Sequence, residues 1–301
     1  MKVLNFGSLN IDYVYDVDSF VRKGETIAST ALNVFSGGKG LNQSLALARA
    51  GADVYHAGMV GEDGKFLIAV LKDSGVDTSH IEISGTVRTG NAIIQRDKSG
   101  DNCIILFGGA NRAITKELAD KVLSSFDRGD FLVLQNEISN LPYIVESAHN
   151  KGMKIVLNPS PMDAEIDKLD LSHIDFFMLN ETEAYAITKE NESDPEKQLE
   201  LLRKRFPSAG ILITLGEKGS MYYDKDNIIT QEAVKVDVVD TTAAGDTFSG
   251  YFVEGLLSGD DIKTVLKRAS AAAGIAVSRR GAAPSIPYRK EVEERLSFYS
   301  L

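Results

Sequence analysis

Four short, uninterrupted apolar runs in the second half of the chain constrain its fold more than any other feature. They cover residues 131–134, 155–157, 176–179 and 211–213. The stretches between them carry apolar residues at helical spacing, as at Leu118, Val122, Leu123 and Phe126. Strands that are apolar on both faces are typical of parallel sheets covered by helices on both sides. We therefore expect an α/β fold, a three-layer α/β/α sandwich with a mostly parallel central sheet.

Two stretches interrupt this alternation of strands and helices. Residues 12–36 begin with an alternating segment, and residues 86–108 hold a second one, followed by a hairpin signal at 97–101. Strands from separate insertions can pair, so we expect one small β-sheet that covers the site as a lid. The expected domains are an α/β domain of residues 1–11, 37–85 and 109–301, and a β lid of residues 12–36 and 86–108.

Composition narrows the class of protein. The 301 residues are 43% hydrophobic and carry a net charge of -10 without a dense basic run, which disfavours a nucleic-acid partner. Cys103 is the only cysteine and the four histidines are scattered, so neither a disulfide framework nor a zinc site is expected. No apolar run is long enough for a membrane span and no signal-peptide pattern opens the chain. These features favour a soluble, cytoplasmic protein.

Residues 238–250 combine a small-residue turn with the start of an amphipathic helix near Ala243. Amides in the first turn of a helix lack internal partners and favour an anion. Asp246 lies in the same turn, where a carboxylate would repel that anion. The combination makes sense if Asp246 removes a proton while the amides hold the group under attack. Alternatively, Asp246 only complements the helix dipole.

Residues 36–43 form a second glycine-rich turn that leads into a helix. Gly40 follows Lys39 where a Walker A loop requires Ser or Thr, and the glycine spacing does not fit a dinucleotide fingerprint. Gly38 allows close approach of a ligand to the backbone, and Lys39 and Asn42 offer hydrogen-bond donors. The alternative is a flexible turn between a strand and a helix.

Polar residues follow most of the expected strands. In an open α/β sheet the carboxyl ends of the strands line one crevice, where ligands bind. These polar groups are Asn10 and Asp12, residues 135–137, Asn158, residues 180–183 and residues 214–219.

Taken together, these motifs resemble the ribokinase-like, or phosphofructokinase B, family of sugar kinases over nearly the whole chain. The resemblance rests on the order of several motifs rather than on any single one. They are Asn10 and Asp12, residues 37–43, residues 109–111, Glu137, residues 158–159, residues 180–183, residues 214–216 with Gly219, and residues 240–246. The form Gly-Gly-Lys-Gly-x-Asn-Gln is most similar to members that phosphorylate ribose.

The resemblance implies transfer of the γ-phosphate of ATP to the primary hydroxyl of a pentose, with D-ribose as the expected substrate and ribose 5-phosphate as the product. Asp246 would be the base, and the amides of Ala243, Ala244 and Gly245 would stabilise charge on the transferring phosphoryl group. The sugar would be held by Asn10, Asp12, Gly38, Lys39, Asn42, Glu137 and Asp246.

The resemblance also implies ATP, Mg²⁺ and K⁺ as cofactors. Glu183 would hold Mg²⁺ through waters. The nucleotide would contact Asn180, Glu183, Thr214, Gly216, Glu217, Lys218, Gly219, Gly245 and Ser270. K⁺ would be bound largely by main-chain oxygens of Asp240, Thr242, Ala276, Arg279, Gly281 and Ser285. Asp240 has no obvious Lys or Arg partner nearby in the sequence; alternatively, backbone amides satisfy it.

Some residues depart from the family pattern. Asn91 and Asn136 could alter the choice of sugar, and Ser270 is small for its position. A nucleoside kinase of the same fold stays open, because Tyr13, Tyr15 and Phe35 could supply an aromatic lid surface. A non-catalytic sugar sensor would not need Asp246.

The lid should present unpaired strand edges, which predicts a homodimer formed through it.

Overall fold

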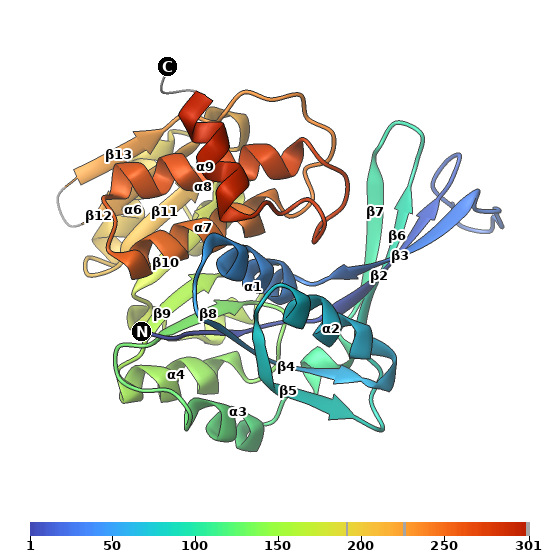
Figure 1. Ribbon diagram of the computed structural model, residues 1–301, viewed down its shortest axis with the longest axis horizontal. Coiled ribbons are helices and arrows are strands. Elements are labelled where there is room, and N and C mark those ends of the chain that lie inside the picture. Colours follow the sequence, from blue (N-terminus) through green and yellow to red (C-terminus); the bar gives the residue numbers. More distant parts are fainter. Residues whose placement is uncertain (191, 225–226, 299–301) are drawn as a thin grey trace.

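The computed structural model describes residues 1–190, 192–224 and 227–298, which form a nine-stranded sheet and a separate four-stranded sheet (Figure 1). In the large sheet seven strands lie side by side and each is parallel to the next; in spatial order they run from β5 (Asp77–Ser84) at one edge to β11 (Gly210–Thr214). The strands β12 (Ser220–Asp224) and β13 (Asn227–Gln231) add an antiparallel hairpin beyond β11. The expected mostly parallel sheet is therefore confirmed. In spatial order its strands are β13 (Asn227–Gln231), β12 (Ser220–Asp224), β11 (Gly210–Thr214), β10 (Phe176–Asn180), β9 (Lys154–Asn158), β8 (Phe131–Gln135), β1 (Val3–Phe6), β4 (Val54–Gly61) and β5 (Asp77–Ser84).

Helices cover both faces of this sheet, as the continuous apolar strands require. Within β10, Phe177 and Leu179 pack into one core, whereas Met178 packs into the other, because successive side chains of a strand point to opposite faces. The first core includes α3 (Lys116–Leu123), α4 (Leu141–Lys151), α5 (Glu181–Thr188) and α6 (Pro195–Arg205). The second includes α1 (Lys39–Ala50), α2 (Lys65–Asp73), α7 (Ala244–Ser258), α8 (Ile262–Val277) and α9 (Arg289–Phe298).

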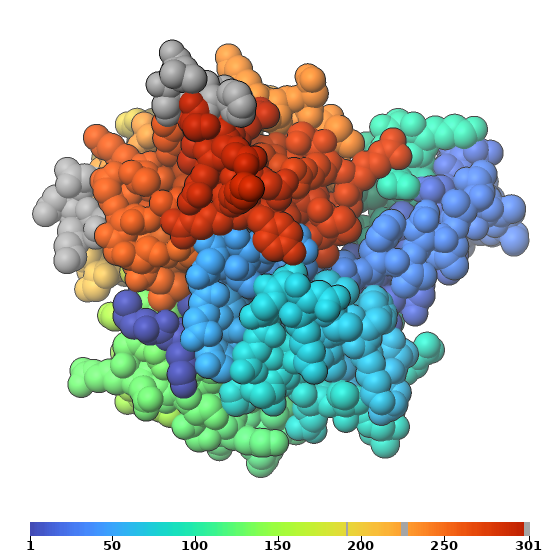
Figure 2. All heavy atoms as spheres, viewed as in Figure 1, coloured from blue at the N-terminus to red at the C-terminus, as the bar shows by residue number. Residues whose placement is uncertain are grey.

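The two insertions do pair into one small sheet, which extends away from the sandwich (Figures 1 and 2). Its strands are, in order, β3 (Ala31–Gly37), β2 (Asn10–Asp16), β6 (Gly90–Arg96) and β7 (Asn102–Phe107). The central pair, β2 and β6, is parallel, and each outer strand is antiparallel to its neighbour. The expected lid is thus present, while the domain boundaries stay a prediction.

Several elements were not anticipated from the sequence. They include α9, which follows α8 at the end of the described chain, and the edge hairpin of β12 and β13. The edge strand β5 extends the sheet beyond β4. Among the described residues, no helix combines the length and the hydropathy that crossing a bilayer requires.

Candidate active site

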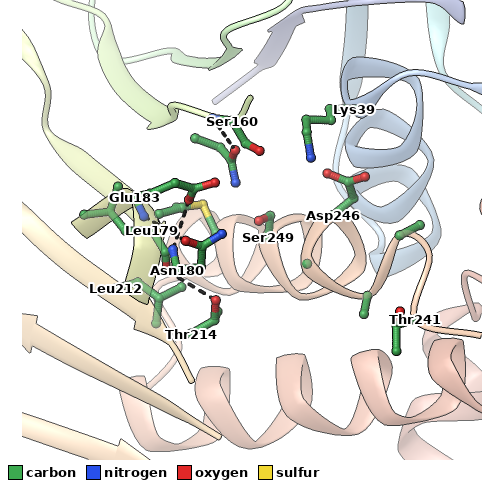
Figure 3. Close-up of a pocket in the computed structure, with 15 residues that line it drawn as sticks. Lys39, Ser160, Leu179, Asn180, Glu183, Leu212, Thr214, Thr241, Asp246 and Ser249 are labelled. Atoms are coloured by element: carbon green, nitrogen blue, oxygen red, sulfur yellow. Dashed lines mark hydrogen bonds between the residues drawn. The ribbon is translucent and has the colours of Figure 1, made fainter. Parts of the chain in front are cut away.

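A pocket opens where the carboxyl ends of three neighbouring parallel strands meet the start of α7 (Figure 3). Asn158 ends β9, Asn180 ends β10 and Thr214 ends β11, and all three line it. Lys39 and Asp246 lie on the opposite side from Asn180 and Thr214 (Figure 3). The expected convergence of polar strand ends on one crevice is therefore present.

The first turn of α7 forms one wall of this pocket. Ala243, with a left-handed φ of 59°, is the residue before the helix, and its methyl group cannot cap the helix. The Ala244 N–H bonds the Thr241 carbonyl at 3.3 Å, whereas the Gly245 N–H has no such bond among the described residues and is available to an anion. A Cβ added to Gly245 would meet no atom within 4 Å, which shows that the pocket is open above this turn.

Asp246 is 7% exposed, and two amide side chains of α1 hold its carboxylate. Asn42 Nδ2 donates to Oδ2 at 3.0 Å, and Gln43 Nε2 donates to Oδ1 at 3.0 Å. This fixes the carboxylate at the edge of the pocket rather than leaving it as a solvated cap of α7. Asn42 Oδ1 is buried and has no partner among the described residues, so it remains free to accept a hydrogen.

Lys39 places a positive charge among three carboxylates. Burial lowers the pKa of its ammonium, but the charges of Asp246, Glu137 and Glu183 outweigh burial and bring the pKa above its usual value. Lys39 therefore stays protonated and lines the pocket from the side of Asp246. A fixed cation between carboxylates suits a ligand that carries phosphate.

Glycine is required where the glycine-rich turn crosses the end of β1. Gly38 has a φ of 97°, and a Cβ there would lie 2.9 Å from the Ser8 carbonyl oxygen. A Cβ on Gly40 would lie 2.3 Å from the Ser8 backbone nitrogen. The close crossing is completed by Glu137, whose carboxylate accepts hydrogen bonds from the Ser8 hydroxyl and, at 3.0 Å, from the Lys39 backbone N–H.

Two carboxyl groups of the expected sugar site lie near one another. Burial raises the pKa of Glu137, against the lowering effects of the Ser8 hydroxyl and the Lys39 charge. Burial and the Glu137 charge raise the pKa of Asp12 to about 7. Asn10 is held beside them, because its Oδ1 accepts from Asn111 Nδ2 at 2.7 Å. These groups offer several acceptors, which suits a ligand with many hydroxyls.

At the other end of the pocket, Asn180 and Glu183 cap α5 reciprocally. Asn180 Oδ1 accepts from the Glu183 N–H at 2.8 Å, and Glu183 Oε2 accepts from the Asn180 N–H at 3.0 Å. The remaining atoms, Asn180 Nδ2 and Glu183 Oε1, can still reach a ligand. A single carboxylate here fits Mg²⁺, which is typically held by one or two carboxylates together with waters and substrate phosphates.

The remaining residues expected at the nucleotide are not among those that line this pocket. Gly216, Glu217 and Lys218 form a 3-10 turn after β11, and Gly219 follows with a φ of 103°. Ser270, on α8, donates from its hydroxyl to the Glu232 carbonyl at 3.1 Å. Its side chain therefore anchors the segment before α7.

The expected cation residues also come together in part. Asp240 Oδ1 accepts from the Thr242 N–H and hydroxyl at 2.9 and 2.6 Å, and Oδ2 accepts from the Gly281 N–H at 2.9 Å. The Asp240 N–H bonds the Val277 carbonyl at 3.2 Å, between Ala276 and Arg279 in the chain. Ser285 bonds instead to the Ala282 carbonyl.

Hydrogen bonds and one charge from the lid act on Asp240. Burial raises its pKa, but the Thr242 hydroxyl and amide, the Gly281 amide and the Arg96 charge lower it below its usual value. The sequence shows no obvious Lys or Arg partner near Asp240, and the structure adds the charge of Arg96. Within the described part of the chain, Arg96 bonds Asp16, and Asp240 accepts only from neutral donors.

Several residues of this region were missed by the sequence reasoning. Ser160, Met178, Leu212, Thr241 and Ser249 line the pocket. Gln43 contacts Asp246 directly, and the polar run 42–44 inside an otherwise apolar helix was a signal that could have revealed it. Asn136 turns toward the loop after β9, where its Nδ2 donates to the Pro161 carbonyl at 2.7 Å, so it supports that loop.

The model of the pfkB family of carbohydrate kinases matches residues 1–289. The chain is 37% identical to a ribokinase of Haemophilus influenzae over 297 residues, 96% of each chain. It is 34% identical to the structure of a ribokinase from Cryptococcus neoformans in complex with ADP, with a TM-score of 0.86 over 98% of this chain and 99% of that one. A ribokinase from Arabidopsis thaliana complexed with ribose and ATP gives a TM-score of 0.87 at 30% identity over 99% of each chain.

Proposed function

This chain belongs to the pfkB family of carbohydrate kinases, and we propose that it transfers the γ-phosphate of ATP to the primary hydroxyl of D-ribose, forming ribose 5-phosphate. The observation that supports this most strongly is the position of Asp246. Its carboxylate is held by two buried amides at the start of α7, across the pocket from Asn180 and Glu183. One cavity thus holds the proposed base, the start of a helix that can bind an anion, and the two residues that would contact the phosphates.

In the proposed reaction the sugar lies between the lid and the glycine-rich turn. Asp12, Glu137 and Asn42 Oδ1 accept hydrogens from its hydroxyl groups. Its primary hydroxyl faces Asp246, which removes the proton as the bond to phosphorus forms. An analogue that lacks one of these hydroxyls would leave the corresponding acceptor without a partner. This cost gives selectivity among sugars.

The residues that would contact the phosphates position them and stabilise their charge. The Gly245 amide and the Lys39 ammonium stabilise the negative charge that spreads over the transferring group. Asn180 Nδ2 orients the phosphates. Glu183 would hold Mg²⁺, which would supply positive charge against that of the phosphates. The chain's own contribution is to align the donor phosphate with the sugar hydroxyl.

The experiment that tests this function is ADP release measured over a panel of pentoses, hexoses and nucleosides. D-ribose should give the highest kcat/KM. A nucleoside preferred over every free sugar would favour the nucleoside kinase alternative, for which Tyr13, Tyr15 and Phe35 would supply a stacking surface. Sugar binding by calorimetry without ADP release would instead favour a sensor.

We also propose that the protein forms a homodimer through the lid. Ile104, Ile105, Leu106 and Phe107 on the edge strand β7 are each more than half exposed. An apolar edge strand of this kind is a site for pairing with another chain. Sedimentation at micromolar concentration should show a dimer, and Ile105→Glu should convert it to monomer. The control Ile228→Glu, at an exposed position of β13, should leave the dimer intact. A wild-type protein that sediments only as monomer would exclude this interface.

We further propose a K⁺ site beside the start of α7, formed by Asp240 and Thr242 together with main-chain oxygens of Ala276, Arg279, Gly281 and Ser285. Three neutral donors contact the Asp240 carboxylate, so its negative charge is not directly neutralised. A bound cation would offset this charge and fix the turn that aims the amides of α7.

Turnover should therefore be higher in K⁺ than in Na⁺ or tetramethylammonium at matched ionic strength. Asp240→Asn should weaken this activation because it removes the charge that attracts the cation. Asp237→Asn, the same change three residues earlier at an exposed position, serves as the control and should retain activation. Equal rates in all three salts would show that Asp240 only caps its turn.

A further inference from the structure

Three fully buried amide side chains lie behind the pocket wall, beneath the glycine-rich turn. Asn5 and Gln135 are 0% exposed and Gln43 is 1% exposed. They belong to β1, β8 and α1, which contact one another in the middle of the sandwich. Burying an amide costs free energy unless its N–H and C=O groups find partners, so their pairing is informative.

The three amides form one directional series of hydrogen bonds that ends on Asp246. Asn5 Nδ2 donates to the Gly40 carbonyl at 2.8 Å, and Asn5 Oδ1 accepts from Gln135 Nε2 at 3.0 Å. The same Gln135 nitrogen donates to Gln43 Oε1 at 2.7 Å. Gln43 Nε2 then donates to Asp246 Oδ1 at 3.0 Å. We call Asn5, Gln135 and Gln43 the amide relay.

The Gly40 carbonyl fixes the direction of the relay, because a carbonyl oxygen can only accept. It requires the nitrogen of Asn5 to face it, which leaves the Asn5 oxygen to accept from Gln135. Gln135 must then turn its nitrogen toward Gln43, and Gln43 keeps its own nitrogen toward Asp246. Reversal of any one amide would place two oxygens or two N–H groups against each other, which is costly in a buried network.

The surroundings of the relay leave it little freedom to turn. The second N–H of Asn5 goes to Ser44 Oγ at 2.8 Å, and that oxygen contacts His56 Nδ1 at 2.8 Å. Burial lowers the pKa of His56 to about 3, so the ring is neutral and adds no charge to the network. Gln135 Oε1 packs against Gly7, where an added Cβ would lie only 2.3 Å away.

We propose that the amide relay consists of positioning residues for phosphoryl transfer, which use the Gly40 carbonyl to orient the Asp246 carboxylate. The proposal rests on the role of Asp246 as the base. Asn42 holds Oδ2 separately, so the relay governs Oδ1. Because Gly40 belongs to the turn that we assign to the sugar, the orientation of the base is tied to the geometry of the sugar site.

A purely structural role would give a different result. If the three amides only join β1, β8 and α1, their loss should lower stability and weaken ligand binding along with turnover. If they position Asp246, turnover should fall while sugar and nucleotide binding stay nearly constant, because no relay side chain is assigned to either ligand. A substitution of Asn5 should then lower turnover only through its effect on Gln43.

The test is a double-mutant cycle with Asn5→Leu and Gln43→Met, which replace the amides by apolar groups of similar size. Misplacement of a catalytic group can cost about 100-fold, so Gln43→Met should lower kcat by about 10- to 100-fold. Asn5→Leu should lower kcat by a smaller factor, and the double variant should match Gln43→Met alone. Gln198→Met removes a buried amide of α6 that bonds Thr188 and does not contact the relay, and it is the matched control. Calorimetric affinities for ribose and a non-hydrolysable ATP analogue should stay within about twofold.

Two results would overturn the relay. One is a folded Asn5→Leu variant with the kcat of wild type, and the other is a double variant whose loss equals the product of the single losses. If Asn5→Leu does not fold, Gln135→Met replaces it in the same cycle with the same expectations. Asp246→Asn, assayed in parallel, distinguishes failure of the proposed base from failure of the relay. If that variant is active, Asp246 is not the base. If it is inactive and the losses of the relay variants multiply, only the relay is overturned.

Discussion

Asp246→Asn is expected to lower turnover by roughly two to four orders of magnitude, because the variant keeps the size of the side chain and loses the basic oxygen. The carboxylate is 7% exposed and lies at the pocket beside the helix start that would hold the phosphoryl group. Sugar and nucleotide binding, measured by calorimetry, should survive. A rate change without a binding change identifies an interaction that matters in the transition state.

A second acid at a helix start provides the control for this experiment. Asp261 caps α8 by accepting the Thr264 N–H at 3.1 Å and does not line the pocket described above. Asp261→Asn should therefore leave turnover close to that of wild type. If Asp246→Asn also turned over within a few-fold of wild type, Asp246 would be a capping residue and another group would have to accept the proton.

Asp12→Ala is expected to raise the KM for the sugar strongly while the KM for ATP stays nearly constant. Loss of an acceptor of charge-assisted hydrogen bonds costs about 2–3 kcal/mol, which corresponds to about 30- to 150-fold. Steady-state kinetics with each substrate varied in turn measures both constants. Asp18→Ala, an exposed position that pairs only with Lys98 on the lid, is the control and should change neither. Parallel rises in both constants would indicate that the lid hinge had unfolded.

The pKa of Asp12 adds a pH dependence to this prediction. Burial and Glu137 raise that pKa from 3.8 to about 7 in the sugar-free protein. The ionised form accepts hydroxyl hydrogens, so sugar affinity should increase as pH rises between about 6 and 8. The wild-type KM should fall over this range, and the KM of Asp12→Ala should not follow it. A wild-type KM independent of pH would show that Asp12 does not bind the sugar.

The same shift affects stability with the opposite sign. The folded sugar-free protein holds the Asp12 proton more tightly than the unfolded chain does. Asp12 therefore contributes stability that is complete at low pH and is lost as pH rises through about 7. This cost above neutral pH is consistent with a group kept for binding rather than for folding.

The sequence predicted the sandwich because its signals are local. The runs around Leu132, Val156, Met178 and Leu212 are apolar on both faces, and a strand with that pattern must be covered by helices on both sides. β5 and α9 were missed for the converse reason. Most of Asp77–Ser84 is partly or fully exposed, and α9 is rich in charged residues, so neither shows a clear apolar pattern.

Site residues could be predicted where a short stretch of sequence contains the interacting groups, as at Asp246 and the start of α7. They could not be predicted where the interacting residues are brought together only by the tertiary fold. Gln43 and Asp246 are separated by 203 residues, and Arg96, whose charge acts on Asp240, belongs to a strand of the lid far away in the sequence. The bond from Asn136 to the Pro161 carbonyl was unpredictable for the same reason, while an effect of Asn136 on the choice of sugar stays a prediction.

The central claim is that this protein phosphorylates the primary hydroxyl of ribose, and product analysis tests it most directly. Wild-type protein, ATP, Mg²⁺ and D-ribose should give a sugar phosphate whose phosphorus NMR coupling places the phosphate on the C5 oxygen. It should form at the same rate as ADP. The analogue 5-deoxyribose, which lacks only the accepting hydroxyl, should give no sugar phosphate. Phosphate on another carbon, or ADP release equal with both sugars, would contradict the account.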